Sequence, residues 1–508
     1  MTTRRRWAAL AVLVLPVLLI SIDMTVLGIA VPALSEDLDP SAAQLLWIID
    51  IYSFLLAGLL VLMGNLGDRI GRRRLLMIGA AAFGAASVFA AFSTSAQMLI
   101  AARALLGLGG ATLMPSTLSL VRTVFPDNRE RRSAIAVWAA AFAGGTALGP
   151  VIGGFMLEHF WWGSVFLINA PVMVVLLFGA VILLPESRNQ NPGPFDVTSA
   201  ALSIAGMLPL VYGLKELGSH GVSVVAITAM LIGIVLLWVF VRRQLTLAEP
   251  LLDVSLFANR VFTVAILTNL LSVFSILGLL FFLPQYLQFV EGLSPLTAGL
   301  WILPFALAAV VGSLAAPALA RLVTLRVVIG GGMLLAAAGF AVGALVIDST
   351  GLIALGLWTA TIGLGIGLAE SLTNDVVVSS APPERTGSAA AVSETAYEMG
   401  GAMGTAVLGT LGLALYRAGL ADASGEVPQH VIDAGSETLG GAQLAAEGLP
   451  GAVADSFLAT AAESFTSGMA VVLLVAGLVA AYTGLQALIV LRTRRARVQE
   501  SATSEVVS

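Results

Sequence analysis

The residues of this sequence that are best suited to chemistry are ionisable side chains inside long apolar segments. Asp23, Arg103, Glu394 and Glu398 each lie among apolar or small residues. An ionisable group in hydrocarbon is costly unless it faces a partner or a water-filled cavity, so such residues mark function by default. These four side chains predict a buried polar site that binds cations, protons or both.

Asp23 lies near the middle of the apolar segment 7–34, and we expect it to be a proton-coupling or substrate-binding carboxylate. Arg103 carries the opposite charge within another apolar segment and is expected to neutralise Asp23 across a cavity. The alternative is that the Arg103 side chain extends to the membrane surface or donates hydrogen bonds to backbone carbonyls.

Glu394 and Glu398 are four residues apart, so they share one face of a helix. Two carboxylates one turn apart repel each other, which favours a proton on one of them unless a cation lies nearby. This pair suits a proton-coupling and substrate-binding site where a proton and a cation compete, and a solvated helix face is the alternative. The histidines cannot replace these acids, because His159, His220 and His430 fall at or beyond the outer ends of the apolar segments.

Three further acids lie in apolar segments, but their positions do not by themselves indicate a functional role. Asp50 begins an apolar segment and fits a functional site and an interfacial helix start equally well. Glu370 and Asp375 lie toward the inner end of their segment, where a solvated carboxylate costs little, so we favour a structural role for both.

Aromatic residues near these segments are candidates to stack on a planar cation in a substrate-binding cavity. Packing or lipid-facing roles are the more common alternative for each. The candidates are Trp138, Phe142, Tyr286 and Tyr397.

The elements that position these residues are recurrent apolar runs. The chain has 508 residues, of which 58% are hydrophobic and 11% charged, whereas soluble domains are about 25% charged. Runs of ~20 apolar residues can cross a lipid bilayer as helices. They predict an all-α polytopic membrane protein with fourteen transmembrane helices, over residues 7–34, 43–63, 75–93, 97–121, 134–157, 163–184, 198–217, 222–241, 261–289, 297–319, 327–347, 351–378, 387–417 and 464–491.

Basic residues predict the orientation of these helices. If both termini are cytoplasmic, all arginines and lysines except Arg103, Lys215 and Arg417 lie in or beside cytoplasmic loops, as the positive-inside rule requires. Arg4–Arg6 precede an apolar stretch that is too long for a signal peptide and contains Asp23, so we interpret it as a retained first span. The expected location is the cell membrane, with multiple passes.

Composition argues against several function classes. Without cysteine the chain has no disulfide, thiolate metal site or cysteine nucleophile. Its basic residues are dispersed, which argues against nucleic acid as a partner, and a GxxxxGK nucleotide loop is absent. No metal-ligand cluster or GxSxG nucleophile motif is evident, so we expect no enzyme, no cofactor and no metal. A scaffold without transport would not need Asp23, Glu394 and Glu398 in lipid.

A weak internal repeat indicates two halves. ISIDMTVLGIAVPAL resembles SVFSILGLLFFLPQYL, with Ser275 in the place of Asp23, and duplicated bundles are typical of secondary transporters. We expect a six-helix bundle over 1–190, two inserted helices over 191–250, a second bundle over 251–491 and a cytoplasmic tail over 492–508. The outer segment 418–463 is either a small external cap or a mobile loop, and we favour the loop.

The most specific motif is GNLGDRIGRRR, residues 64–74, between the second and third spans. It matches the GxLxDRxGRR pattern of the major facilitator superfamily, which the sequence therefore resembles. The resemblance implies a conformational latch between the two bundles on the cytoplasmic side. The counterpart in the second half, GSLAAPALARLVTLR, lacks the acid, so the latch is expected to be asymmetric. The latch residues are Gly64, Asp68, Arg69, Gly71 and Arg72.

Other segments carry the same resemblance, namely LIAARALLGLGGA, IDMTVLGIAVPAL and WWGSVFLINAP. GTALGPVIGG matches the GxxxGPxxGG pattern of the superfamily's exporters. Physically, Pro150 bends its helix and the glycines let another helix approach closely. The residues of this antiporter motif are Gly145, Gly149, Pro150, Gly153 and Gly154.

Over nearly the whole chain the sequence is similar to the fourteen-span drug:proton antiporters of the QacA, SmvA and LfrA type. This resemblance implies the major facilitator fold and a proton-driven exporter, with protons, the lipid bilayer and lipophilic cations as partners. Expected substrates are dyes, quaternary ammonium compounds and fluoroquinolones, and we expect a monomer. The alternative is an exporter of an endogenous metabolite or lipid with the same fold.

Overall fold

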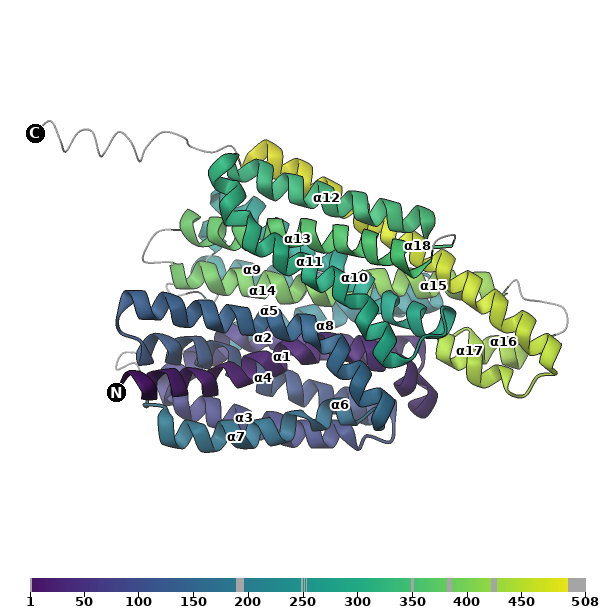
Figure 1. The fold of residues 1–508 in the computed structure, drawn as a ribbon, viewed down its shortest axis with the longest axis horizontal. Helices are drawn as coiled ribbons and strands as arrows, with labels where there is room; N and C mark the ends of the chain where they lie inside the picture. The colour runs from purple at the N-terminus through teal and green to yellow at the C-terminus, as the bar shows by residue number, and fades with distance from the viewer. Residues whose placement is uncertain are drawn as a thin grey trace, which may run out of the picture.

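The computed structural model describes residues 2–188, 196–247, 250, 252, 254–348, 351–381, 386–421 and 427–491. Within these residues, fourteen helices are long and apolar enough to cross a membrane, and each overlaps one of the predicted spans. Most of the helices run side by side along the long axis of the molecule (Figure 1). The predicted tail 492–508 and the start of the predicted inserted segment at 191–195 lie outside the described residues.

The first bundle is built from the N-terminal spans. In it α1 packs against α4, α5 and α7, while α2 and α3 both pack against α4. Its helices are α1 (Thr3–Leu38), α2 (Ala42–Ile70), α3 (Arg72–Ala91), α4 (Ala96–Val124), α5 (Asn128–His159), and the short α6 (Ser164–Leu167) continued by α7 (Asn169–Leu183).

The second bundle is built from the C-terminal spans, in which α10 packs against α13, α14 and α18. Two of its spans contain a π-helical turn, η2 (Tyr286–Val290) after α10 and η4 (Thr405–Gly409) between α14 and α15. Its helices are α10 (Arg260–Gln285), α11 (Pro295–Leu322), α12 (Leu325–Val346), α13 (Leu352–Ser380), α14 (Thr386–Gly404), α15 (Thr410–Ala421) and α18 (Gly451–Val490), preceded by the 3₁₀ turn η1 (Val254–Ala258).

The two bundles meet along three pairs of helices: α5 packs against α11, α2 against α14, and α1 against α10. Close helix contact here relies on residues without bulky side chains. A Cβ at Gly154 would lie 2.5 Å from the Pro295 carbonyl oxygen, and one at Gly299 would lie 2.3 Å from that of Pro150. The last part of the GTALGPVIGG motif therefore forms a contact between the bundles as well as within one.

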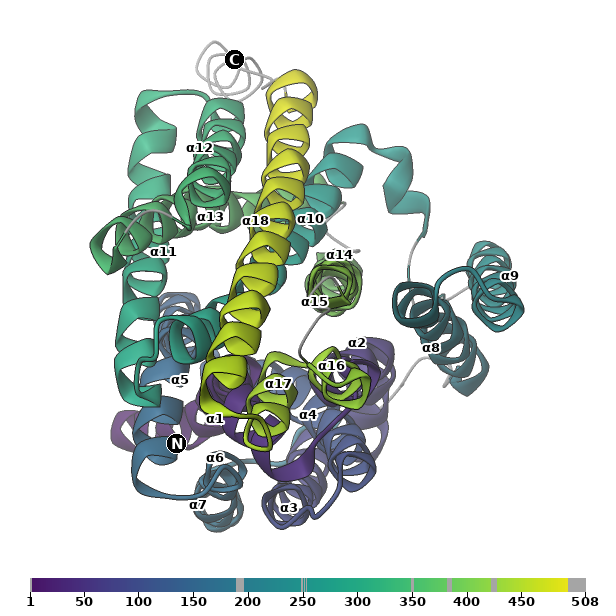
Figure 2. The same cartoon turned by 90° about the vertical axis from the view of Figure 1, so that its right-hand side faces the viewer.

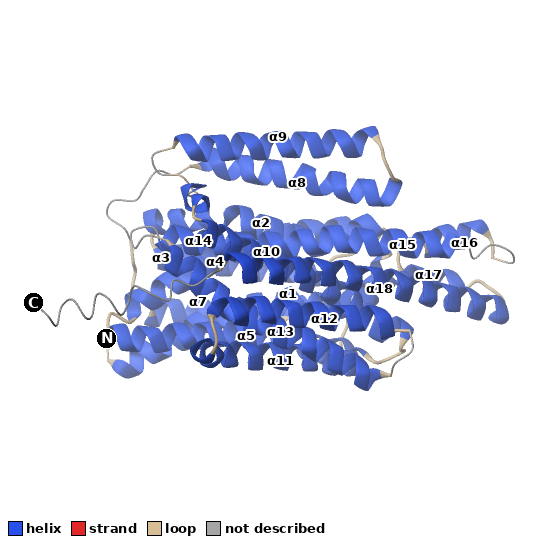
Figure 3. Cartoon of the chain, turned by 90° about the horizontal axis from the view of Figure 1, so that it is seen from above, coloured by secondary structure: helices blue, strands red, loops and turns tan. Residues whose placement is uncertain are grey.

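The inserted spans form a hairpin, α8 (Val197–His220) and α9 (Val224–Thr246), at one side of the two bundles (Figures 2 and 3). Helix α8 contacts α2, α15 and η4, and α9 packs mainly on α8. The outward face of α9 is apolar and exposed, including Leu231, Val235 and Trp238, as expected for a lipid-facing helix.

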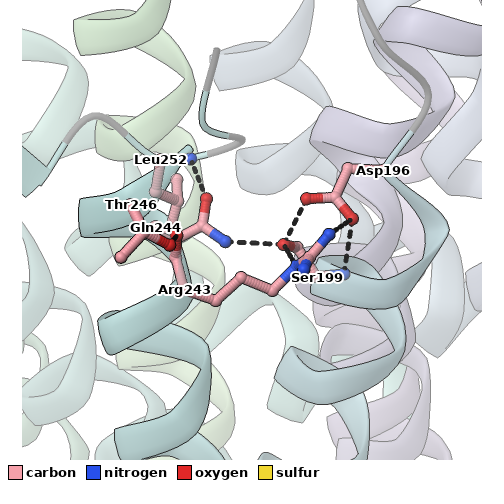
Figure 4. A network of polar contacts seen from close by, with 6 residues as sticks. All are labelled: Asp196, Ser199, Arg243, Gln244, Thr246 and Leu252. Atoms are coloured by element: carbon pink, nitrogen blue, oxygen red, sulfur yellow. Dashed lines mark hydrogen bonds and ion pairs between the residues drawn. The ribbon is translucent and has the colours of Figure 1, made fainter. Parts of the chain in front are cut away.

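A polar network holds the two helices of this hairpin together at the end where the chain enters and leaves it (Figure 4). The Asp196 carboxylate caps α8 by accepting from the Ser199 backbone N–H at 3.0 Å and also accepts from Arg243 of α9 at 3.0 Å. Partial burial opposes ionisation of Asp196, but the hydrogen bonds from Ser199 and Arg243 outweigh it and lower its pKa.

The segment between α15 and α18 corrects one expectation, because we favoured a mobile loop over 418–463. Its described part contains α16 (Gln429–Gly435) and α17 (Leu439–Ala446), with Val431, Ile432 and Leu439 buried. These helices form a cap that lies at the opposite end of the molecule from the N-terminus (Figure 1), and α17 contacts both α1 and α18. Small apolar residues such as Ala442, fully buried, let so short a segment pack. The last span also begins earlier than predicted, at Gly451.

Candidate functional site

A cavity lies between the two bundles and is lined by residues of α1, α2, α4 and α5 on one side and of α10, α11, α13 and α14 on the other. Most of its lining is apolar, as in sites for lipophilic ligands. Its described lining includes four acidic or basic side chains: Asp50 and Arg103 from the first bundle, and Glu370 and Glu398 from the second. A second cavity adjoins it and shares Glu370 in its wall.

Asp23 and Arg103 form a buried ion pair. Arg103 Nη1 donates to Asp23 Oδ2 at 2.5 Å, and Arg103 Nε donates to the Ile48 carbonyl at 3.1 Å. Both side chains are at most 2% exposed, so Arg103 does not extend to the membrane surface. The guanidinium also lies 4.5 Å from the centre of the Tyr52 ring. Arg103 lines the cavity and Asp23 does not, which places the carboxylate behind the guanidinium.

The glycines of the GTALGPVIGG motif position Asp23. A Cβ at Gly145 would lie 2.0 Å from Ser21 Oγ, and a Cβ at Gly149 would lie 2.0 Å from Thr25 Oγ1. The two contacts on α1 thus lie on either side of Asp23 in the sequence, and α5 can approach only because side chains are absent there. A third contact follows, since a Cβ at Gly153 would lie 2.6 Å from Val26.

A second ion pair was not foreseen. Lys215 Nζ of the inserted helix α8 lies 2.9 Å from Asp50 Oδ2, and both side chains are 1% exposed. For Asp50 a functional site and an interfacial helix start were equally expected, and the structure corrects the second alternative, because Asp50 lies two turns inside α2 and lines the cavity. A lysine within the predicted span 198–217 was the available signal, since a cation in lipid needs a partner.

Among the described residues, the acids that the second bundle contributes have no basic partner of this kind. Glu398 lines the cavity at 2% exposure, and no hydrogen-bond partner is found for its Oε1 within the described part of the chain. Glu394 is half-buried one turn away and is not in the cavity wall, but its charge acts on Glu398. The structure therefore brings Glu398 into the cavity and keeps Glu394 behind it.

Glu370 corrects another expectation, because we favoured a structural, solvated role near the inner end of its span. It lines both cavities and its Oε1 accepts a hydrogen bond from Ser272 Oγ at 2.9 Å. The reason is that the Glu370 side chain is directed into the protein, toward the cavities and Ser272, although the residue lies toward the inner end of α13. Asp375 is exposed, which is the placement expected of a solvated acid.

The four aromatic candidates divide into two groups. Phe142 and Tyr397 line the cavities with ring centres 6.4 Å apart at an angle of 72°. Trp138 and Tyr286 are absent from the walls of both cavities. Trp138 donates to Thr117 Oγ1 at 3.3 Å, and the Tyr286 hydroxyl donates to Glu291 at 2.7 Å. Trp138 and Tyr286 thus take the packing role that was the alternative for these candidates, while Phe142 and Tyr397 remain candidates for contact with a substrate.

The turn between α2 and α3 holds the residues predicted to form a latch. Asp68 accepts two hydrogen bonds from Arg72, at 2.6 and 2.9 Å, within the same turn. Gly71 adopts φ +109°, which favours glycine, and a Cβ there would collide with Glu186 after α7.

The structure does not require the residue type at the other positions of this motif as strictly as it requires glycine at Gly71. A Cβ at Gly64 would make only an ordinary contact, 3.8 Å from Pro115 Cβ, and Arg69 lies in the last turn of α2. The described contacts of Asp68 are all within the first bundle, so the expected link to the second bundle is not present in this conformation.

Among the described residues, no three His, Cys, Asp or Glu side chains are grouped as a metal site requires. The charged groups in the cavity wall instead suit an organic cation or protons, because the two kinds of ligand neutralise carboxylates without needing fixed coordination geometry.

Comparison with known proteins adds a second line of evidence. The family model described as Major Facilitator Superfamily matches residues 13–405. The chain is 48% identical to the multidrug efflux pump LfrA of Mycolicibacterium smegmatis, over 92% of this chain and 93% of that one. It is 38% identical to the methyl viologen resistance protein SmvA of Salmonella typhimurium (93% and 96%) and 34% identical to the tetracenomycin C resistance and export protein of Streptomyces glaucescens (99% and 94%).

Solved structures show the same fold at low sequence identity. A bacterial homologue of the human lysosomal transporter Spinster, crystallised in an inward-facing, unoccupied conformation, aligns with a TM-score of 0.69 at 17% identity, covering 98% of this chain and 100% of that one.

Proposed function

This chain belongs to the major facilitator superfamily as a multi-pass membrane transporter related to multidrug efflux pumps, and we propose that it is a proton-coupled antiporter for cationic amphipathic compounds. The observation that carries this proposal is the buried Glu398 carboxylate, which lines the cavity and has neither an ion pair nor a hydrogen bond to its Oε1 among the described residues. A buried acid without a counter-charge binds a proton or a cation. Both ligands cannot be held by one charge, so they compete.

In this mechanism the two glutamates of α14 exchange the ligands. When protons occupy Glu398 and its neighbour Glu394, the cavity has less attraction for a cation, and when a cation enters, it favours release of the protons. Phe142 and Tyr397 supply ring faces for a planar cation. Alternating exposure of the cavity then converts a proton gradient into export of the cation.

Asp23 acts through Arg103 in this proposal. Because Arg103 is in the cavity wall and Asp23 is behind it, the carboxylate balances a positive charge that would otherwise repel a cationic substrate. Asp23 is thus required for substrate binding and coupling without touching the substrate itself. Candidate substrates are dyes, quaternary ammonium compounds and fluoroquinolones.

The test is transport in reconstituted vesicles. Liposomes containing the purified protein are loaded with ethidium, and dye efflux is followed with the outside acidified or at equal pH. We expect faster efflux when the outside is acidic, because protons then enter as the dye leaves. A matched Glu398→Gln preparation should lose this acceleration. Efflux by the wild-type protein that is independent of the pH gradient would contradict the proposal.

A second candidate function is export of an endogenous metabolite by the same fold. The observation in its favour is that one relative is named for resistance to and export of tetracenomycin C. The two functions differ in charge dependence: a neutral cargo should compete for binding without any contribution from Glu398. Competition of ethidium binding by neutral polyketides and by quaternary ammonium compounds, compared in wild type and Glu398→Gln, separates them.

We also propose that both termini are cytoplasmic and that the cap is external, as the distribution of arginines predicts. A reporter fused after Arg74 or Arg497 should be cytoplasmic, and one inserted between α16 and α17 should be external. An external reporter at Arg497 would require a different number of spans and would contradict this orientation.

A further inference from the structure

The inserted hairpin brings a lysine to the wall of the transport cavity. Lys215 comes from α8, which belongs to neither six-helix bundle, and its Nζ lies 2.9 Å from Asp50 Oδ2 of α2. The same Nζ lies 4.2 Å from the centre of the Trp47 ring. Both charged side chains are 1% exposed. A buried cation with one carboxylate and one aromatic partner is held firmly in place.

The two residues of this pair have different positions relative to the cavity. Asp50 is in its wall, whereas Lys215 is not. Lys215 therefore contacts Asp50 from behind, and Asp50 Oδ1 has no hydrogen-bond partner within the described residues. Asp50 is thus a residue of the cavity wall whose charge is compensated by a lysine that is outside that wall.

The charges that act on Asp50 come from two neighbouring helices and from across the cavity. Lys215 of α8 and Arg103 of α4 are positive, and Arg103 is itself paired with Asp23 of α1. Glu398 of α14 faces them from the second bundle. Asp23 and Asp50 of the first bundle thus each have a basic partner, while Glu370 and Glu398 form no ion pair with any residue that the structure describes.

The hairpin is fastened to the transport core at this level. Met207 and Val211 of α8 form a buried cluster with Phe54 of α2 and with Ala402 and Ala406 of the second bundle. In contrast, the Asp196–Arg243 network at the other end joins α8 to α9 (Figure 4). The Lys215–Asp50 pair therefore links the hairpin to the first bundle beside the cavity, where it influences the site.

We propose that Lys215 is a positioning residue that keeps Asp50 ionised through the transport cycle, so that the inserted hairpin limits the number of protons exchanged for each cation. A buried carboxylate without a base takes up a proton or an external cation. Because Lys215 stays paired with Asp50, Asp50 does not bind a proton or a substrate cation. The exchange of protons for cations then takes place at the acids of the second bundle. This inference rests on the proposed cation-for-proton exchange.

The experiment counts protons released per cation bound. The full chain is purified in detergent and titrated with ethidium in buffers of different ionisation enthalpy, so that the buffer dependence of the heat gives the number of protons. Lys215→Met removes the internal cation and should make Asp50 exchangeable, which raises the count by up to about one proton per ethidium. Lys215→Arg keeps the positive charge and should give the wild-type count.

The double variant Asp50→Asn/Lys215→Met removes both charges and should also give the wild-type count. If Lys215→Met fails to fold, the double variant still tests the proposal, because it leaves no unpaired buried charge and should fold. A lower count in the double variant would show that Asp50 exchanges protons in the wild type and would overturn the proposal. An unchanged count in a folded Lys215→Met protein would overturn it as well.

Failure of the proposed function gives a different result. If the wild-type protein releases no protons on binding ethidium, the exchange mechanism is wrong. Proton release by Lys215→Met in that case would still support the role of Lys215. If neither protein releases protons, both proposals are wrong.

Discussion

The two bundles each place acids in or behind the cavity wall, but the surroundings of these acids differ. In the first bundle Asp23 is paired with Arg103 and Asp50 with Lys215, at 2.5 and 2.9 Å. In the second bundle Glu398 and Glu370 form no ion pair with any described residue, and Glu370 accepts a single hydrogen bond from Ser272. A buried ion pair is costly to break. A buried acid without a basic partner can instead exchange a bound proton for a bound cation. The proposed mechanism therefore assigns fixed charges to the first half and exchangeable charges to the second.

This contrast also appears at positions related by the internal repeat. Asp23 of α1 corresponds to Ser275 of α10, whose hydroxyl donates to the Leu271 carbonyl at 3.0 Å and to the Ala476 carbonyl at 3.2 Å. The charge at this position has no counterpart in the second half. The acids of the second half instead come from α13 and α14. Similar backbones thus support two different electrostatic roles.

The largest effect is expected from breaking a fixed pair. Asp23→Asn leaves Arg103 uncompensated in the cavity wall, and breaking a buried pair costs about 3–5 kcal/mol. We expect proton-driven ethidium efflux to fall more than ~100-fold, because a loss of about 2.7 kcal/mol already gives that factor. Expression and melting temperature should be measured beside efflux, and Glu158→Gln on the exposed end of α5 is the control. Normal efflux by a folded Asp23→Asn protein would show that the first half is not needed as a fixed pair.

The next effect concerns the exchangeable acids. In wild type, affinity for a permanently charged dye should rise with pH, because deprotonation of Glu394 and Glu398 frees the charge that attracts it. The double variant Glu394→Gln/Glu398→Gln should bind the dye about tenfold more weakly at high pH, from a loss of roughly 1–2 kcal/mol, and should lose most of the pH slope.

Binding of the dye in detergent at several pH values checks this expectation, with a neutral ligand as the control that should be least affected. Equal affinity and equal pH slope in both proteins would show that these carboxylates are bystanders. In that case the exchange site lies elsewhere, and the contrast between the halves fails.

A smaller effect is expected from Glu370, which has the Ser272 hydroxyl as a partner. Glu370→Gln keeps a hydrogen-bonding group but removes a negative charge from both cavities, and we expect ethidium affinity to fall about threefold, within the range of a single partly compensated charge. Asp375→Asn on the same helix α13 is the matched control, because Asp375 is exposed and should have no effect. Equal effects of the two variants would place Glu370 outside the site.

The smallest effect is expected at the turn between α2 and α3. Asp68 pairs with Arg72 in a partly exposed site, and such pairs contribute about 1 kcal/mol or less. Asp68→Asn should slow transport while ethidium affinity stays within about a factor of ten. Binding lost outright would assign Asp68 to the site, and unchanged turnover would argue against a conformational role for this turn.

The spans, the fold class and the close packing at glycines could be predicted from the sequence, because each depends on the composition or motifs of a single segment. The fourteen spans could be predicted because hydrocarbon requires long apolar helices, and the described helices overlap each of them. The fold class followed from the motif strings, which the family comparison confirms. Glycine spacing in GTALGPVIGG indicated close helix packing, though not that α1 would be the partner.

Other assignments failed because they depend on distant residues. Lys215 and Asp50 are far apart in the sequence and meet only because the inserted hairpin packs on α2. Glu370 was assigned to the wrong surroundings because sequence gives the depth of a residue in a span but not the direction in which its side chain faces. A cap was the less favoured alternative for a related reason, since its short helices are stabilised by contact with α1 and α18.

By itself, the sequence determined that this chain is a polytopic helical membrane protein with acids and an arginine inside its spans, because polarity and segment length are properties of the chain. Only the tertiary structure decided which of those charges are paired. The solvation of a buried charge depends on the groups within a few ångströms of it, and for Asp23, Asp50 and Glu398 those groups come from other helices.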